Sequence, residues 1–174
     1  MSVSRYQSSV PVFERALSAL SGILDKAAAH AAARKFDPAI YLTTRLRPDM
    51  FAFARQVQTA CDQAKNGTGR LAGIEPPKFD DTEASLEELS ARIKATLAFL
   101  KSVDPKAVDA SGDREIVFPV GPNKMKMKGA DYLLHNLLPN FYFHLTAAYV
   151  LLRYNGVEIG KRDFLGAIPG IAPA

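Results

Sequence analysis

Apolar residues recur at alternating intervals of three and four along four long segments of the chain. This spacing gathers them on one face of an α-helix. The first segment covers residues 4–33, and its stripe consists of Tyr6, Val10, Phe13, Leu17, Leu20, Leu24 and Ala27. The other three segments are residues 48–73, 82–104 and 130–156. The pattern therefore predicts four long amphipathic helices.

Prolines and capping residues add detail to these four segments. Pro38 follows an aspartate and predicts a short helix over residues 38–44, because proline suits the first helical position. Asp81 or Thr82 is expected to cap the third long helix. Pro139 lies inside the fourth stripe, where its missing N–H predicts a kink.

Residues 114–128 break the helical pattern. Residues 114–120 are rich in β-formers, Gly121-Pro122-Asn123 is a turn signal, and residues 124–128 alternate lysine and methionine. These features predict a small β-hairpin. The predicted fold is therefore all-α: a four-helix bundle with one long crossover and a small β-hairpin before the last helix. We expect a single domain of residues 1–166, followed by a flexible C-terminal tail of residues 167–174.

Length and composition fit one globular domain. The 174 residues are 48% hydrophobic and 23% charged, and no apolar run reaches membrane-spanning length. The first ten residues lack the apolar stretch of a signal peptide. The lone Cys61 excludes an internal disulfide and a multi-cysteine zinc site. We therefore expect a cytoplasmic protein with no membrane partner.

The charge of the chain is mildly basic, with 22 Lys and Arg against 18 Asp and Glu. The densest positive cluster is Lys124, Lys126 and Lys128, whose alternation with methionine is typical of a half-exposed edge strand. We therefore expect no nucleic-acid partner. The alternative is that this edge binds an anion or a nucleic acid.

Several stretches of the chain resemble a known family. They are Tyr6–Phe13, Arg47–Phe51, Arg55–Gln58, Tyr132–His135, Leu138–His144, Ala148–Arg153 and Asn155–Phe164. Together they resemble an uncharacterised bacterial family of unknown function, grouped with the DinB/YfiT-like superfamily of four-helix bundles and proposed metalloenzymes. The resemblance covers nearly the whole chain and implies a DinB-like bundle.

The resemblance also implies a site between the second and fourth helices. Superfamily members commonly bind a divalent metal through three histidines, two of them four residues apart on the fourth helix. Aligned on this pattern, His144 matches one histidine, whereas Asn140 and Gln56 take the other two positions. Amide oxygens replace imidazole poorly at a transition-metal site. We therefore expect a degenerate site without a tightly bound metal, and weak binding of a divalent metal is the alternative.

The candidate pocket residues are thus Gln56, Asn140, His144 and His135, which precedes His144 by about two and a half helical turns. His144 has the alternative role of a hydrogen-bonded polar residue inside the bundle. Asn140 has the alternative role of satisfying backbone groups beside Pro139.

Three functions remain open from the sequence. The first is binding of a small molecule in the pocket between the second and fourth helices. The second is a metal- or thiol-cofactor-dependent transferase or isomerase, as in some superfamily members. The third is a non-catalytic dimeric interaction protein. We expect a homodimer, because the resemblance implies one and because Phe36, Ile40, Tyr41 and Phe51 offer surplus apolar surface.

Overall fold

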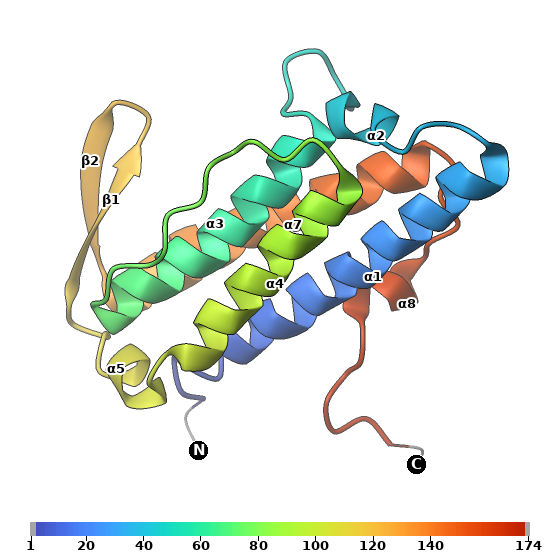
Figure 1. The fold of residues 1–174 in the computed structure, drawn as a ribbon. Helices are drawn as coiled ribbons and strands as arrows, with labels where there is room; N and C mark the ends of the chain where they lie inside the picture. Colours follow the sequence, from blue (N-terminus) through green and yellow to red (C-terminus); the bar gives the residue numbers. More distant parts are fainter. Residues whose placement is uncertain (1–2, 173–174) are drawn as a thin grey trace.

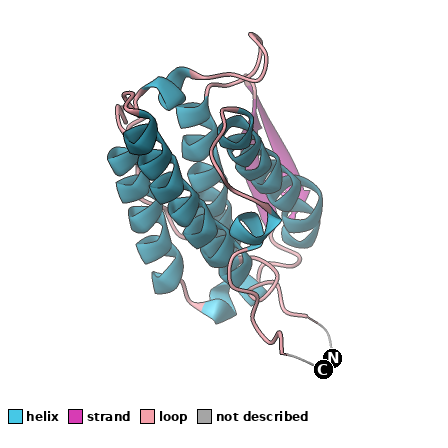
Figure 2. Cartoon of the chain, turned by 90° about the vertical axis from the view of Figure 1, so that its right-hand side faces the viewer, coloured by secondary structure: helices cyan, strands magenta, loops and turns pink. Residues whose placement is uncertain are grey.

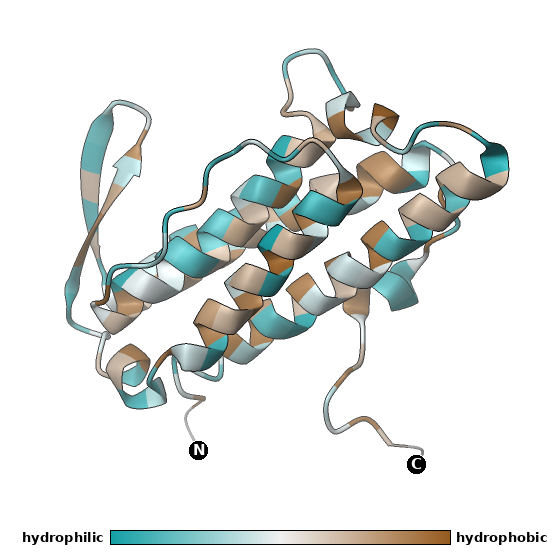
Figure 3. Ribbon diagram, viewed as in Figure 1, coloured by the Kyte–Doolittle hydropathy of each residue, from teal (hydrophilic) through white to brown (hydrophobic). Residues whose placement is uncertain are grey.

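Four long helices lie side by side in the computed structural model of the protein, which describes residues 3–172 (Figure 1). They are α1 (Val10–Arg34), α3 (Phe53–Ala72), α4 (Leu86–Ser102) and α7 (Leu138–Tyr154). The expectation of a mainly helical chain is confirmed. Each long helix carries both hydrophobic and hydrophilic positions (Figure 3), as the stripes predicted.

The first stripe forms the buried face of α1. Its members Val10, Phe13, Leu17, Leu20 and Leu24 are all at most 1% exposed. The regular helix begins at Val10, directly after Ser9, because Pro11 is accommodated only in the first turn.

The second long helix begins at Phe53, so the predicted start at Pro48 is wrong. Residues 44–52 instead form a loop whose two ends meet, because the Phe53 N–H donates to the Thr44 carbonyl oxygen at 2.9 Å. The predicted short helix is present as α2 (Ile40–Thr43). Gly73, with a φ of 72°, ends α3 where the sequence placed the end of the segment.

A long crossover of residues 73–85 joins α3 to α4. The predicted caps, Asp81 and Thr82, lie within this crossover. The cap is Ser85, whose Oγ accepts a hydrogen bond from the Glu88 N–H at 3.1 Å. Asp81 is engaged elsewhere, since it pairs with Arg92 on α4.

After α4, a short helix α5 (Pro105–Asp109) leads to the predicted hairpin. Strands β1 (Glu115–Val120) and β2 (Asn123–Lys128) pair antiparallel and lie at one end of the helical body (Figure 1), behind the helices in the view of Figure 2. Ile116 and Phe118 of β1 are buried, whereas the lysines of β2 are exposed. One face of β1 therefore packs inward, and the lysines of β2 face solvent.

The last long segment is irregular where the sequence predicted a kink. A single turn, α6 (Gly129–Asp131), is followed by a π-helical segment η1 (Tyr132–Leu137) and then by α7. Pro139 sits in the first turn of α7 and has no N–H to donate to the turn before it. The wider π-helical turn thus immediately precedes the proline.

The chain after α7 contains a helix that the sequence did not predict. Gly156, with a φ of 87°, turns the chain, and α8 (Lys161–Leu165) then packs against α1. Lys26 of α1 pairs with Asp163 of α8 at 2.6 Å. Of the predicted tail, residues 173–174 lie outside the described part, and residues 167–172 form neither helix nor strand. Within the described residues, every helix is too short or too polar to cross a membrane.

Candidate functional site

His144 and Gln56 meet where α7 packs on α3. The imidazole Nδ1 of His144 lies 2.7 Å from Oε1 of Gln56, a hydrogen bond between residues 88 positions apart. Both side chains are buried, with exposed fractions of 8% for His144 and 1% for Gln56. The structure therefore joins two of the four candidate residues directly.

The orientation of the Gln56 amide determines the tautomer of His144. Nε2 of Gln56 donates to the carbonyl oxygen of Phe51 at 3.3 Å, so the Gln56 oxygen is the atom that faces the imidazole. An amide oxygen only accepts hydrogen bonds, and Nδ1 of His144 must therefore carry the proton. In the neutral ring, Nε2 then bears a lone pair. Among residues 3–172, no side chain or backbone group hydrogen-bonds to this Nε2.

Two aromatic rings flank the imidazole. The Phe51 ring, carried by the loop of residues 44–52, lies nearly parallel to it at 6.1 Å between centroids. The Phe143 ring meets it edge to face at 5.2 Å. Both phenylalanines are about half exposed, at 48% and 58%. The imidazole thus contacts the Phe51 and Phe143 rings, and both rings are also partly exposed to solvent.

Burial and a nearby positive charge keep His144 neutral. Burial is the main cause that lowers the pKa of His144 below its ordinary value, and the guanidinium of Arg55 lowers it further. At neutral pH the ring is therefore unprotonated at Nε2. Such a nitrogen can accept a hydrogen bond or a proton.

The other two candidate residues do not join this pair through any direct hydrogen bond. The Asn140 side-chain amide donates to the carbonyl oxygen of Asn136 at 2.7 Å, on its own segment. This agrees with the alternative role of Asn140 in satisfying backbone groups beside Pro139. His135 lies in the π-helical turn and is exposed. The expectation that His135 and His144 share one helix face assumed 3.6 residues per turn. The π-helical turn between them is wider, so that spacing does not apply.

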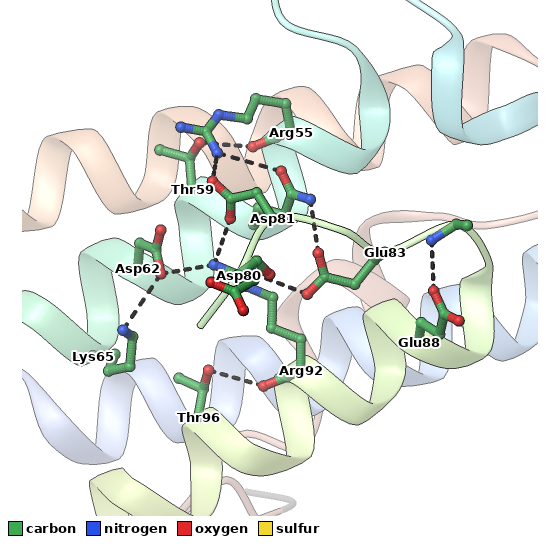
Figure 4. Close-up of polar contacts among 12 residues, drawn as sticks. Arg55, Thr59, Asp62, Lys65, Asp80, Asp81, Glu83, Glu88, Arg92 and Thr96 are labelled. Carbon is green, nitrogen blue, oxygen red and sulfur yellow. Dashed lines mark hydrogen bonds and ion pairs between the residues drawn. The ribbon is translucent and has the colours of Figure 1, made fainter. Parts of the chain in front are cut away.

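A second polar cluster, centred on Arg92 of α4, lies between α3, α4 and the crossover (Figure 4). Arg92 is 4% exposed, and its guanidinium contacts the carboxylates of Asp62 at 2.9 Å, Asp81 at 3.0 Å and Glu83 at 2.9 Å. It also donates to the carbonyl oxygen of Asp80 at 3.1 Å. Burial opposes ionisation of Glu83, but the hydrogen bonds from Arg92 and Gln58 lower its pKa overall.

Lys65 of α3 also contacts the crossover. The Nζ of Lys65 donates to the Pro77 carbonyl oxygen at 2.5 Å and lies 4.5 Å from the centre of the Phe79 ring. Burial lowers the pKa of Lys65 from its ordinary value. Lys65, Asp62 and Phe79 help to line a hollow of about 460 Å³. The crossover is thus attached to both neighbouring helices by buried charge.

The Arg92 cluster extends to the neighbourhood of His144. Gln58 donates to Glu83 at 2.8 Å and accepts from Arg55 at 3.4 Å. Arg55 also pairs with Asp81 (Figure 4). The Cζ of Arg55 lies 5.9 Å from the centre of the Phe51 ring, which itself stacks on His144. The crossover therefore helps to hold Arg55 beside the imidazole.

Sequence reasoning missed Arg92, Glu83 and Lys65. Asp62 and Arg55 were visible as charged residues of the second segment, but their partners were not. The available signal was that Arg92 directly precedes Ile93, an apolar residue that α4 buries. Cys61 is a buried thiol, and burial raises its pKa to about 12.

Comparisons with known proteins agree on one family. Residues 5–165 match the family described as "Domain of unknown function (DUF1993)". The chain is also 40% identical to a DinB family member protein from Shewanella denitrificans, whose crystal structure superposes with a TM-score of 0.90 and covers 97% of this chain and 95% of the other. This chain belongs to the DUF1993 family, an uncharacterised DinB-like family. No curated protein matches the chain.

The donor set of this DUF1993 member does not fit the three-histidine metal site implied by the superfamily. His144 is the one imidazole in the α3–α7 contact, and its Nδ1 is already bound to Gln56. The Asn140 side-chain amide donates to the carbonyl oxygen of Asn136 on its own segment. Among residues 3–172, no three histidine, cysteine, aspartate or glutamate side chains gather as a group that could hold a metal ion.

Proposed function

We propose that this DUF1993 protein is a DinB-like four-helix bundle that binds a small molecule through Nε2 of His144, at the edge of the α3–α7 contact, without a tightly bound transition metal. The observation that carries the proposal is the orientation of the Gln56 amide by the Phe51 carbonyl oxygen. It places the proton of His144 on Nδ1 and leaves Nε2 as an acceptor. The ligand should therefore present an O–H, N–H or S–H donor.

The surroundings of His144 support an aromatic or apolar ligand body. The half-exposed rings of Phe51 and Phe143 provide flat apolar surface next to the imidazole. A hollow of about 430 Å³ adjoins Phe143 and is lined by Leu46, Met50, Tyr142, Thr146, Ala147 and Val150. Phe143 borders both this hollow and the imidazole, so a small ligand that donates to Nε2 could also cover the two rings.

The test compares phenol with anisole, its methyl ether, which lacks the donor hydrogen. We expect phenol to shift the NMR signals of the His144 ring and anisole to leave them in place. His135→Gln should bind phenol as the wild type does, because His135 is exposed and lies outside the pair. Equal shifts with both probes would contradict the role of Nε2. Elemental analysis of the same sample should find no stoichiometric transition metal, and one zinc or nickel ion per chain would favour the transferase or isomerase alternative.

A second candidate, a homodimer, is supported by the outer face of α7. From Leu138 to Leu152 the helix carries no Lys, Arg, Asp or Glu, and helices that are apolar on all sides are usually buried on all sides. Yet Phe143 and Val150 are exposed on it, at 58% and 36%. Two of the residues first suggested for an interface do not contribute, because Tyr41 is buried and Phe36 packs on it within the chain.

We expect sedimentation to show a dimer at micromolar concentration. Val150→Lys should shift the protein to monomer, because the lysine would place a charge in a two-fold contact between α7 faces. Val117→Lys is the matched control, since Val117 is an exposed valine on the hairpin at 52% exposure. A monomeric wild type, or dissociation caused by Val117→Lys alone, would exclude this interface.

A further inference from the structure

Arg55 has more hydrogen-bonding capacity than its neighbours use. Nη1 is the guanidinium nitrogen that contacts Gln58 and Asp81. Among residues 3–172, neither Nε nor Nη2 of Arg55 has a hydrogen-bond partner. An Arg guanidinium presents five N–H donors in a planar fork that matches a carboxylate with two parallel hydrogen bonds. The side chain is 44% exposed, so part of it is accessible to a solute.

The position of Arg55 places this unused edge beside the proposed ligand. Its Cζ lies 5.9 Å from the centre of the Phe51 ring, and the His144 ring lies 6.1 Å from the same centre. Arg55 and His144 therefore both lie next to the exposed Phe51 ring, and the guanidinium is close enough to the imidazole to lower the pKa of His144. A ligand lying on Phe51 could reach both a strong donor and the Nε2 acceptor.

The local charge favours an anion. Residues 44–55 contain Arg45, Arg47 and Arg55 but only one acidic residue, Asp49. Together with Asp81, the acidic partner of Arg55, these residues carry a net charge of +1, and the nearby carboxylates of Asp62 and Glu83 are paired with Arg92. Asp81 is 37% exposed and also contacts Arg92, so it stays paired when Arg55 binds another carboxylate.

We propose that the ligand of this site is a small aromatic acid whose carboxylate binds the free edge of Arg55 while its hydroxyl or thiol donates to Nε2 of His144. This inference rests on the proposed function, because it assumes that His144 contacts the ligand. It adds the chemical class of the ligand and assigns Arg55 as the residue that selects for negative charge. Asp81 and Gln58 become positioning residues that hold the guanidinium from its opposite side.

The test measures binding of 4-hydroxybenzoate and of its neutral analogue 4-hydroxybenzamide by calorimetry. We expect the acid to bind the wild type at least about tenfold more tightly than the amide. Arg55→Met should remove this preference. Arg47→Met is the matched control and should keep it, because Arg47 is highly exposed and pairs only with Asp49. Arg55→Lys keeps the charge but loses the planar fork, so it should retain part of the preference for the acid. This variant replaces Arg55→Met in the test if Arg55→Met does not fold.

The outcomes separate the two proposals. Equal binding of acid and amide, a preference that survives Arg55→Met, or no binding of either compound would overturn the role of Arg55. The phenol and anisole comparison judges His144 independently, since neither probe carries a carboxylate. If phenol shifts the His144 signals while the acid shows no advantage, the proposed function stands and the ligand class is wrong.

Discussion

Replacing Arg92 by methionine should lower the free energy of unfolding by about 3–5 kcal/mol, the usual cost of removing one partner from a buried ion pair. Methionine keeps much of the side-chain volume but removes the positive charge. Asp62, Asp81 and Glu83 would then be left facing one another without their common cation. Urea denaturation followed by circular dichroism measures the effect.

Lys94→Met is the matched control for this change. Lys94 lies two positions away on the same helix and is exposed, so its loss should alter stability by no more than about 0.5 kcal/mol. Equal stability of the Arg92 and Lys94 variants would show that the ion cluster does not hold the crossover to α3 and α4.

The Arg92 effect should also depend on pH. The pKa of Glu83 is lowered in the folded protein, so its ionised form favours folding at pH values above its unfolded pKa. This contribution is lost as the pH falls through the lowered, folded-state pKa. The stability difference between wild type and Arg92→Met should therefore shrink in acid. A difference that grows in acid would contradict this assignment of Glu83.

Gly67→Ala should destabilise the protein by about 1–3 kcal/mol, the usual cost of overpacking a core. Gly67 lies in α3 where η1 crosses it, and an added Cβ would lie 2.9 Å from Cγ of Leu137 and closer still to its methyl carbons. Leu137 is fully buried and has little room to move. The substitution should thus push η1, and the α7 helix that follows it, away from α3.

Gly22→Ala provides the comparison for Gly67→Ala, because an added Cβ at Gly22 in α1 meets no atom within 4 Å. The same change there should raise stability by up to about 1 kcal/mol through helix propensity alone. Thermal unfolding of both variants distinguishes close packing from propensity. Stabilisation by both substitutions would show that η1 does not need a glycine at this contact.

The local sequence pattern predicted which segments are helical better than it predicted where each helix begins and ends. The stripe of α1 could be read directly, because helical periodicity and burial act over a few residues. The start of α4 could not, since Asp81, Thr82 and Ser85 all have capping chemistry. What decides between them is the path of the crossover, where Asp81 binds Arg92. Helix α8 depends on packing against α1, far away in sequence, and no local stripe marks it.

The candidate site was likewise predicted only in part. The register implied by the family resemblance placed Gln56 and His144 opposite one another, and the structure shows a hydrogen bond between them. Asn140 was placed with them by the same register, but a backbone carbonyl one turn away on its own segment engages its amide. Arg55 could be assigned no role from sequence, because its neighbours come from Phe51, Gln58 and the distant crossover.

The most direct test of the proposed site is the protonation state of His144, measured by long-range ¹H–¹⁵N NMR with His30→Gln and His135→Gln variants for assignment. We predict a neutral ring at pH 7 with its proton on Nδ1, and a pKa below the ordinary 6.5 that rises in Arg55→Met. Gln56→Leu should remove the preference for the Nδ1–H tautomer, since the accepting oxygen is gone. An imidazolium, or a ring protonated on Nε2, at pH 7 in the wild type would contradict the proposed site.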